Sequence, residues 1–91
     1  MLTSKQRAEL RAQANGLDVT LIVGKEGITD TLIESAGILL ESKELIKGKV
    51  LENSPLSPRE GAEELARATR SEVVQVIGTK FVLYRESHTK E

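Results

Sequence analysis

Two different spacings of hydrophobic residues follow each other in the first half of this 91-residue chain. Residues 19–23 form a short apolar run rich in β-branched side chains, which is typical of a buried strand. Apolar residues then recur at helical spacing: Leu32, Ile33, Ala36, Leu39 and Leu40. The pattern therefore predicts a strand followed by a helix, with Thr29 as the N-cap residue of that helix.

The segments on either side of this pair predict one more helix and one more strand. Thr3 and Gln6 match a capping box in front of a helix that ends near Ala14. Residues 44–51 alternate as a strand does, which places Lys47 and Lys49 on one face. These lysines either extend a basic surface or protect an exposed edge strand from aggregation, and the pattern leaves both interpretations open.

The last third of the chain predicts a helix and a β-hairpin. Ser57, Pro58 and Glu60 occupy the N-cap, N1 and N3 positions of a helix that ends near Arg70. Residues 72–77 and 80–85 are strand-like runs separated by Gly-Thr, a pair typical of a two-residue hairpin.

The predicted order of elements is therefore helix–strand–helix–strand–helix–strand–strand. Strand–helix–strand units favour parallel neighbours with a right-handed crossover, and the final hairpin adds one antiparallel pair. We expect an α/β fold, a two-layer single domain with a four-stranded mixed sheet, over residues 1–85. Residues 86–91 form a polar tail, and the length leaves no room for a second core.

Composition and charge argue against several classes of function. The chain has no cysteine, and its one histidine, His88, lies in the polar tail. No spacing typical of metal ligands or of a catalytic site is present, so we expect no enzyme, metal, cofactor or small-molecule substrate. Without an apolar signal core or a membrane-spanning stretch, the chain is expected to be a cytoplasmic monomer with no membrane partner. The formal net charge of −1 does not by itself favour a polyanionic partner.

The segment Gly24-Lys25-Glu26-Gly27 lies where the first predicted strand ends and the next helix begins. Glycine permits positive φ and lets another backbone come close. A helix N-terminus presents unpaired N–H groups and the positive end of the macrodipole, and Lys25 adds a mobile positive charge. The segment is therefore a candidate anion site. It is also compatible with an ordinary strand–helix turn, and its spacing matches neither a P-loop nor a dinucleotide fingerprint.

Four motifs taken together resemble the CRM domain, as found in the bacterial YhbY family. They are GKEGIT at residues 24–29, KELIK at 43–47, QVIG at 75–78 and VLYR at 82–85, and the resemblance spans residues 2–85. It implies an RNA-binding domain with a fold similar to the C-terminal domain of translation initiation factor three. Bacterial single-domain members of this family are associated with precursors of the large ribosomal subunit. Plant relatives carry the domain in organellar intron-splicing factors.

The resemblance also implies where RNA is bound. The GxxG loop of the family, likened to that of KH domains, falls on residues 24–27. Lysine and arginine side chains occupy some of the other positions that match the family. The expected RNA-binding residues are Gly24, Lys25, Glu26, Gly27, Thr29, Lys47, Lys49 and Arg85.

A hypothesis from a different class stays open beside this one. The chain is then a protein-interaction module that docks on an assembly factor or a ribosomal protein without direct RNA contact. Its support is the low overall basicity and the acidic helix face formed by Glu60, Glu63 and Glu64.

Overall fold

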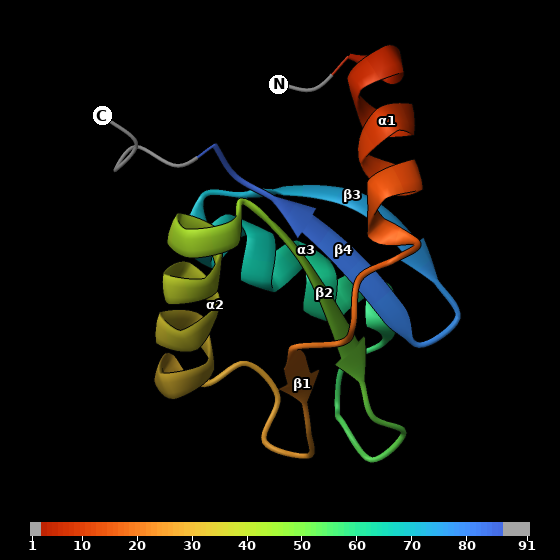
Figure 1. Ribbon diagram of the computed structural model, residues 1–91. Helices are drawn as coiled ribbons and strands as arrows, with labels where there is room; N and C mark the ends of the chain where they lie inside the picture. The colour runs from red at the N-terminus through yellow and green to blue at the C-terminus, as the bar shows by residue number, and fades with distance from the viewer. Residues whose placement is uncertain (1–2, 87–91) are drawn as a thin grey trace.

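The elements follow one another in the order that the sequence predicts (Figure 1). The computed structural model describes residues 3–86, so His88 and most of the predicted tail lie outside the described residues. The helices are α1 (Ser4–Ala14), α2 (Asp30–Lys43) and α3 (Pro58–Thr69). The strands are β1 (Leu21–Val23), β2 (Leu45–Val50), β3 (Glu72–Ile77) and β4 (Lys80–Tyr84). None of the described helices has the length and apolar character that crossing a bilayer requires.

Each helix begins after a residue whose side chain caps the first turn. Thr3 and Ser57 each form the predicted capping box, and Thr29 caps α2. At the other ends, Glu44 and Arg70 follow α2 and α3 with φ values of 66° and 59°. The three predicted N-caps are therefore confirmed.

The four strands form one mixed sheet in the order β1-β2-β4-β3. β1 and β2 are parallel, as a strand–helix–strand unit predicts, and β4 pairs antiparallel with both β2 and β3. β2 is therefore an inner strand. The interpretation of Lys47 and Lys49 as protection for an exposed edge is wrong, because β1 and β4 flank β2 on its two sides.

The main core lies between one face of the sheet and the helices α2 and α3, which are the two predicted layers. Leu40 of α2 and Leu65 of α3 are fully buried against the strands, as is Phe81 of β4. The Phe81 ring lies directly over Gly48 of β2. A Cβ at that position would lie 2.3 Å from Cζ of the ring, so this core requires glycine in the middle of the strand.

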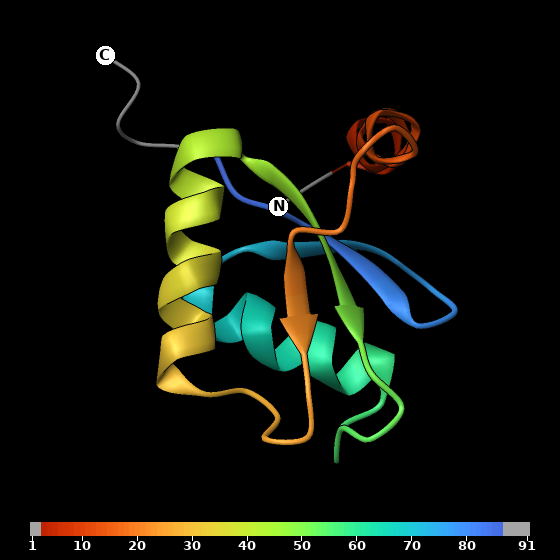
Figure 2. The same cartoon turned by 60° about the horizontal axis from the view of Figure 1, so that its bottom comes forward.

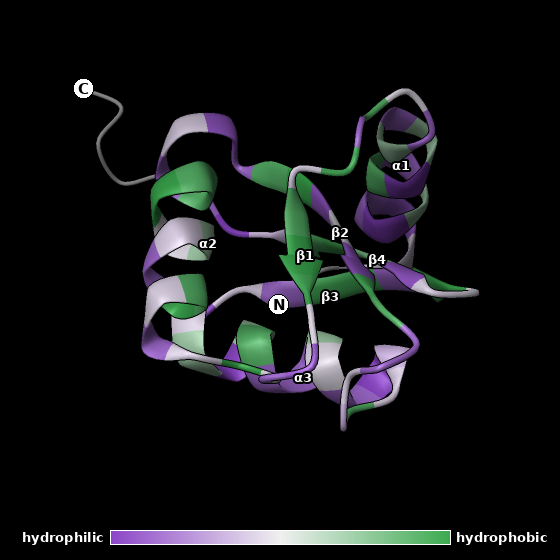
Figure 3. Cartoon of the chain, turned by 90° about the horizontal axis from the view of Figure 1, so that it is seen from below, coloured by the Kyte–Doolittle hydropathy of each residue, from purple (hydrophilic) through white to green (hydrophobic). Residues whose placement is uncertain are grey.

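α1 adds cover on the opposite face of the sheet, as Figures 2 and 3 show from two directions. Ala14 packs there with Leu45, Val74 and Val82 in a second, smaller core. A guanidinium nitrogen of Arg7 also donates to the carbonyl oxygen of Val73, next to a register shift in β3. α1 contacts β2 and β3 and covers only part of this face.

Candidate nucleic-acid interface

The loop between β1 and α2 is a tight turn closed by its two glycines. The N–H of Gly27 donates to the carbonyl oxygen of Gly24 at 3.0 Å, and Gly27 adopts a φ of 71°. Residues with a Cβ disfavour this left-handed conformation. A Cβ on Gly27 would lie 3.5 Å from Cγ of Pro55, in the connection between β2 and α3. The second glycine therefore fixes the turn and its position against the neighbouring connection.

Gly24 has no such conformational requirement. It is not among the glycines with positive φ, and a Cβ there would meet only Cδ1 of Leu51, at 4.0 Å. That distance is ordinary van der Waals contact. The fold therefore does not require glycine at this position, and the missing Cβ leaves the backbone there less obstructed.

The tip of the turn adjoins the N-terminus of α2. Lys25 and Glu26 are both exposed. The hydroxyl of Thr29 accepts a bond from the N–H of Leu32 at 3.1 Å, which satisfies one donor of the first turn. The N–H groups of Asp30 and Thr31 precede the first bonds within the helix, so the positive end of α2 lies close to the loop. Backbone donors and Lys25 can therefore attract an anion here.

An open hollow of about 270 Å³ lies beside the loop. Ile22 of β1 and Leu32 of α2 are the apolar residues that line it, and the loop contributes polar and charged ones. This combination suits a ligand that has both an anionic and an apolar part, as a nucleotide has. The lining residues are Ile22, Gly24, Lys25, Glu26, Gly27, Thr29 and Leu32.

Lys47 and Lys49 project from the face of the sheet that α1 partly covers, but their surroundings differ. The Lys47 amine donates to the carbonyl oxygen of Ala14 at 3.5 Å, at the C-terminal end of α1. A cation is favourable at that end of a helix. Lys49 is paired in register with Ile22, two residues before Gly24. Of the two lysines, Lys49 is therefore the one that lies nearer to the loop along the sheet.

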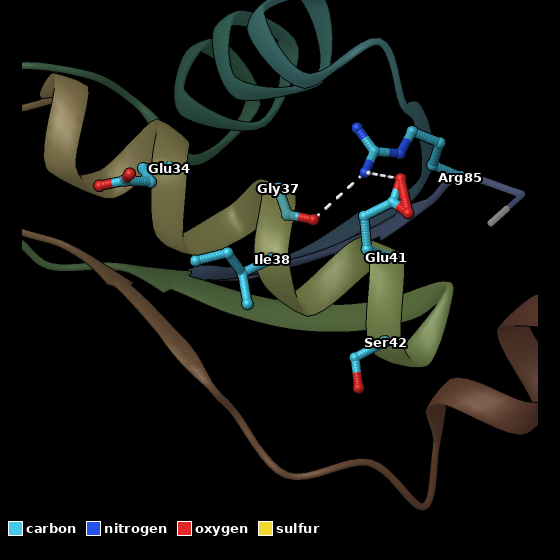
Figure 4. Close-up of a pocket in the computed structure, with 6 residues that line it drawn as sticks. All are labelled: Glu34, Gly37, Ile38, Glu41, Ser42 and Arg85. Atoms are coloured by element: carbon cyan, nitrogen blue, oxygen red, sulfur yellow. Dashed lines mark hydrogen bonds and ion pairs between the residues drawn. The ribbon is translucent and has the colours of Figure 1, made fainter. Parts of the chain in front are cut away.

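The structure does not bring Arg85 to the loop. Arg85 follows β4 at the opposite end of the sheet (Figure 1). Its guanidinium donates to the carbonyl oxygen of Thr69 at 2.7 Å. It also donates to the carbonyl oxygen of Gly37 at 3.2 Å and pairs with Glu41 at 3.1 Å (Figure 4). The side chain is 19% exposed. These contacts join α2, the end of α3 and β4, so the geometry favours a structural task for Arg85.

The acidic face that supports protein docking lies on α3, which packs on the other side of the sheet from Lys49. Glu60, Glu63 and Glu64 are exposed there, and Glu63 pairs with Arg59 at 3.5 Å. The exposed face of α3 also carries Arg59 and Arg67, so it is mixed in charge, and it lies across the sheet from Lys49. Among residues 3–86, no group of three His, Cys, Asp or Glu side chains is placed to hold a metal ion.

A comparison with protein families decides what kind of domain this is. The model of the CRS1/YhbY (CRM) domain matches residues 2–85. The chain belongs to this family. The resemblance predicted from the four sequence motifs is therefore confirmed, and the GxxG loop lies within the matched part of this CRM domain.

Relatives of the CRM domain carry names that describe RNA binding. The chain is 44% identical over 87 residues to "Probable RNA-binding protein YqeI" of Bacillus subtilis (strain 168), covering 96% of this chain and 91% of that protein. It is 40% identical over 86 residues to "Probable RNA-binding protein MJ0652" of Methanocaldococcus jannaschii, covering 92% of this chain and 63% of that protein.

A solved structure shows the same fold for the whole domain. The solution structure of the hypothetical protein SAV1595 from Staphylococcus aureus matches with a TM-score of 0.83 at 46% identity. The match covers all of this chain and 95% of the other. The predicted α/β domain with a four-stranded mixed sheet is thereby confirmed.

Proposed function

We propose that this CRM-domain protein is an RNA-binding protein whose target is ribosomal RNA in precursors of the large ribosomal subunit, in the cytoplasm. Family membership and the names of its relatives support RNA as the ligand. The ribosomal target rests on the resemblance to the bacterial single-domain members. The observation that supports the site best is a turn with an unobstructed backbone at Gly24, an exposed Lys25 and an adjacent helix N-terminus.

In this proposal the loop captures the RNA backbone. A phosphate oxygen accepts hydrogen bonds from backbone N–H groups beside Gly24 and from the ammonium group of Lys25, and charge-assisted bonds of this kind are short and strong. Gly27 and Thr29 hold the loop and the start of α2 in place. Glu26 has its carboxylate at the exposed tip and must point away from the phosphate. Lys49 contacts the neighbouring stretch of RNA, and Lys47 adds positive charge from its place under α1.

The test reverses one charge at the loop and the same charge at a distant place. Tagged wild type, Lys25→Glu and Lys5→Glu are each incubated with bacterial ribosomal particles that include large-subunit precursors, and the mixtures are separated on a sucrose gradient. Lys5 is exposed on α1, so Lys5→Glu changes net charge equally without touching the loop. We expect wild type and Lys5→Glu to migrate with the precursors, and Lys25→Glu to lose about tenfold or more in affinity.

Two other outcomes would each contradict a part of this proposal. If the folded Lys25→Glu variant stays with the precursors as wild type does, the loop is an ordinary turn, and docking through the acidic face of α3 becomes the better hypothesis. If no variant, wild type included, migrates with precursors, the ribosomal assignment is wrong. Circular dichroism and thermal melting of each variant show that any loss is not a loss of folding.

A further inference from the structure

Two of the exposed isoleucines lie on one face of the sheet. Among the described residues, the large hydrophobic side chains with high exposure are Ile22 at 48%, Ile38 at 64% and Ile77 at 62%. Ile38 lies on the outer side of α2 (Figure 4). Ile22 and Ile77 belong to β1 and β3, the two edge strands. Each edge strand thus has one exposed β-branched side chain, and what lies between the two decides whether they belong to one surface.

The strand register places two lysines between these isoleucines. Ile22 is opposite Lys49, Lys49 is opposite Lys80, and Lys80 is opposite Ile77. Directly paired residues share a face of the sheet. The four side chains therefore form one row across all four strands, which we call the cross-strand row. With neighbouring strands about 4.8 Å apart, this row is roughly 14 Å long.

The cross-strand row is the part of this face that α1 leaves uncovered. At the far end of the same face, Leu45 and Val82 are buried under α1. At the row, Lys80 is exposed and Lys49 is partly exposed. This face of the sheet is thus buried under α1 at one end and exposed at the other.

The charges of the row are arranged unfavourably for the protein alone. Like charges directly opposite each other on neighbouring strands repel and destabilise a sheet. Lys49 and Lys80 are in this position, and neither has an ion-pair partner among the described residues. A polyanion that lies over the row relieves this repulsion. The charge pattern therefore favours a phosphate backbone over an uncharged protein surface as the occupant.

The row is also continuous with the loop. Ile22 is its first member, and the same residue lines the hollow beside Gly24 and Lys25. We infer that single-stranded RNA held at the GxxG loop continues along the cross-strand row, with Lys49 and Lys80 bonding its phosphates and Ile22 and Ile77 lying against its bases and sugars. This inference rests on the proposed function and extends its site from one loop to a path that ends at the β3–β4 hairpin.

The test measures binding to a pool of single-stranded 12-nucleotide RNAs of random sequence by fluorescence anisotropy. The proteins are wild type, Lys80→Gln, Ile77→Ser and, as a control of equal charge change, Lys5→Gln. We expect Lys80→Gln and Ile77→Ser each to weaken binding by about three- to tenfold, and Lys5→Gln to bind as wild type does. In wild type, addition of the RNA should shift the amide NMR signals of Lys49, Ile77 and Lys80 together with those of the loop.

The results of this experiment distinguish a failure of this inference from a failure of the proposed function. If wild type binds the RNA and Lys25→Glu weakens it, but Lys80→Gln and Ile77→Ser have no effect and the row signals do not shift, the row is not on the RNA path. If the row variants bind RNA normally yet lose association with ribosomal particles, the row contacts a protein and the inference is overturned. If wild type itself binds no RNA, the proposed function fails first.

Discussion

The two glycines of the GxxG loop are alike in sequence but not in conformation. Gly27 has a φ of 71° and is buried against Pro55, whereas Gly24 has neither constraint. Gly27→Ala should therefore lower the free energy of unfolding by about 1–2 kcal/mol, because a Cβ disfavours the left-handed region. Gly24→Ala should leave unfolding by urea unchanged within about 0.5 kcal/mol and weaken RNA binding about tenfold, because a methyl group then separates the backbone from the phosphate.

Urea unfolding measures the stability of the two variants, and fluorescence anisotropy measures their affinity for RNA. Unchanged RNA affinity in Gly24→Ala would mean that no phosphate approaches the backbone there. A Gly27→Ala variant as stable as wild type would mean that the turn adapts without strain.

At the scale of single residues, the sequence predicts the contacts that form between residues close together in the chain. Thr3, Thr29 and Ser57 bond groups three residues away, and all three caps are found as expected. The requirement for Gly48 is different in kind. Its partner Phe81 is on another strand, and only the folded sheet brings the ring over the missing Cβ. A local pattern contains no information about such a contact.

At the scale of elements, the guanidinium of Arg85 connects three of them. It bonds carbonyl oxygens at the end of α3 and in the middle of α2, and it pairs with Glu41. Arg85→Lys keeps the charge but loses the planar fork of donors. We expect this change to lower the free energy of unfolding by about 1–3 kcal/mol, as loss of hydrogen bonds from a charged group does, and to leave RNA affinity unchanged.

The matched control is Arg67→Lys, because Arg67 is exposed on α3. Urea unfolding of both variants separates a structural task from a binding task. A stable Arg85→Lys variant with RNA binding weakened about tenfold would instead support the RNA contact that the family resemblance implies.

Sheet order is the other property of elements that the sequence left undecided. Alternation in residues 44–51 predicts that Lys47 and Lys49 share a face, and β2 has that geometry. It does not tell which strands flank β2. β4 lies between β2 and β3 because the hairpin places its second strand against β2, and this pairing sets the register of Lys49 with Lys80. The cross-strand row therefore has no sequence signature, and Ile22, Ile77 and Lys80 were not among the expected site residues.

For the whole molecule, the distribution of charge matters more than its sum. The formal net charge is −1, but the exposed carboxylates of α3, which lie beside exposed arginines, are on one side of the sheet, whereas Lys49 and Lys80 lie on the opposite face. At physiological ionic strength the Debye length is about 8 Å, so charges on the far face are largely screened from RNA at the loop and the row. A net charge near zero is thus compatible with RNA binding through a local basic surface.

Binding through a few local phosphate contacts has a specific dependence on salt. Each phosphate contact on a single strand contributes about −0.7 to the slope of log K against log salt, so about three contacts give a slope near −2. Lys49→Gln should bring the slope closer to zero by about 0.7. Glu64→Gln changes the net charge by the same amount in the opposite sense, but from the far side of the sheet, and should leave the slope unchanged. Anisotropy titrations between 50 and 300 mM KCl measure all three slopes.

Equal and opposite shifts in the two variants would show that total charge, rather than the contacts of individual lysines, governs binding. A slope of zero in wild type would exclude phosphate capture altogether.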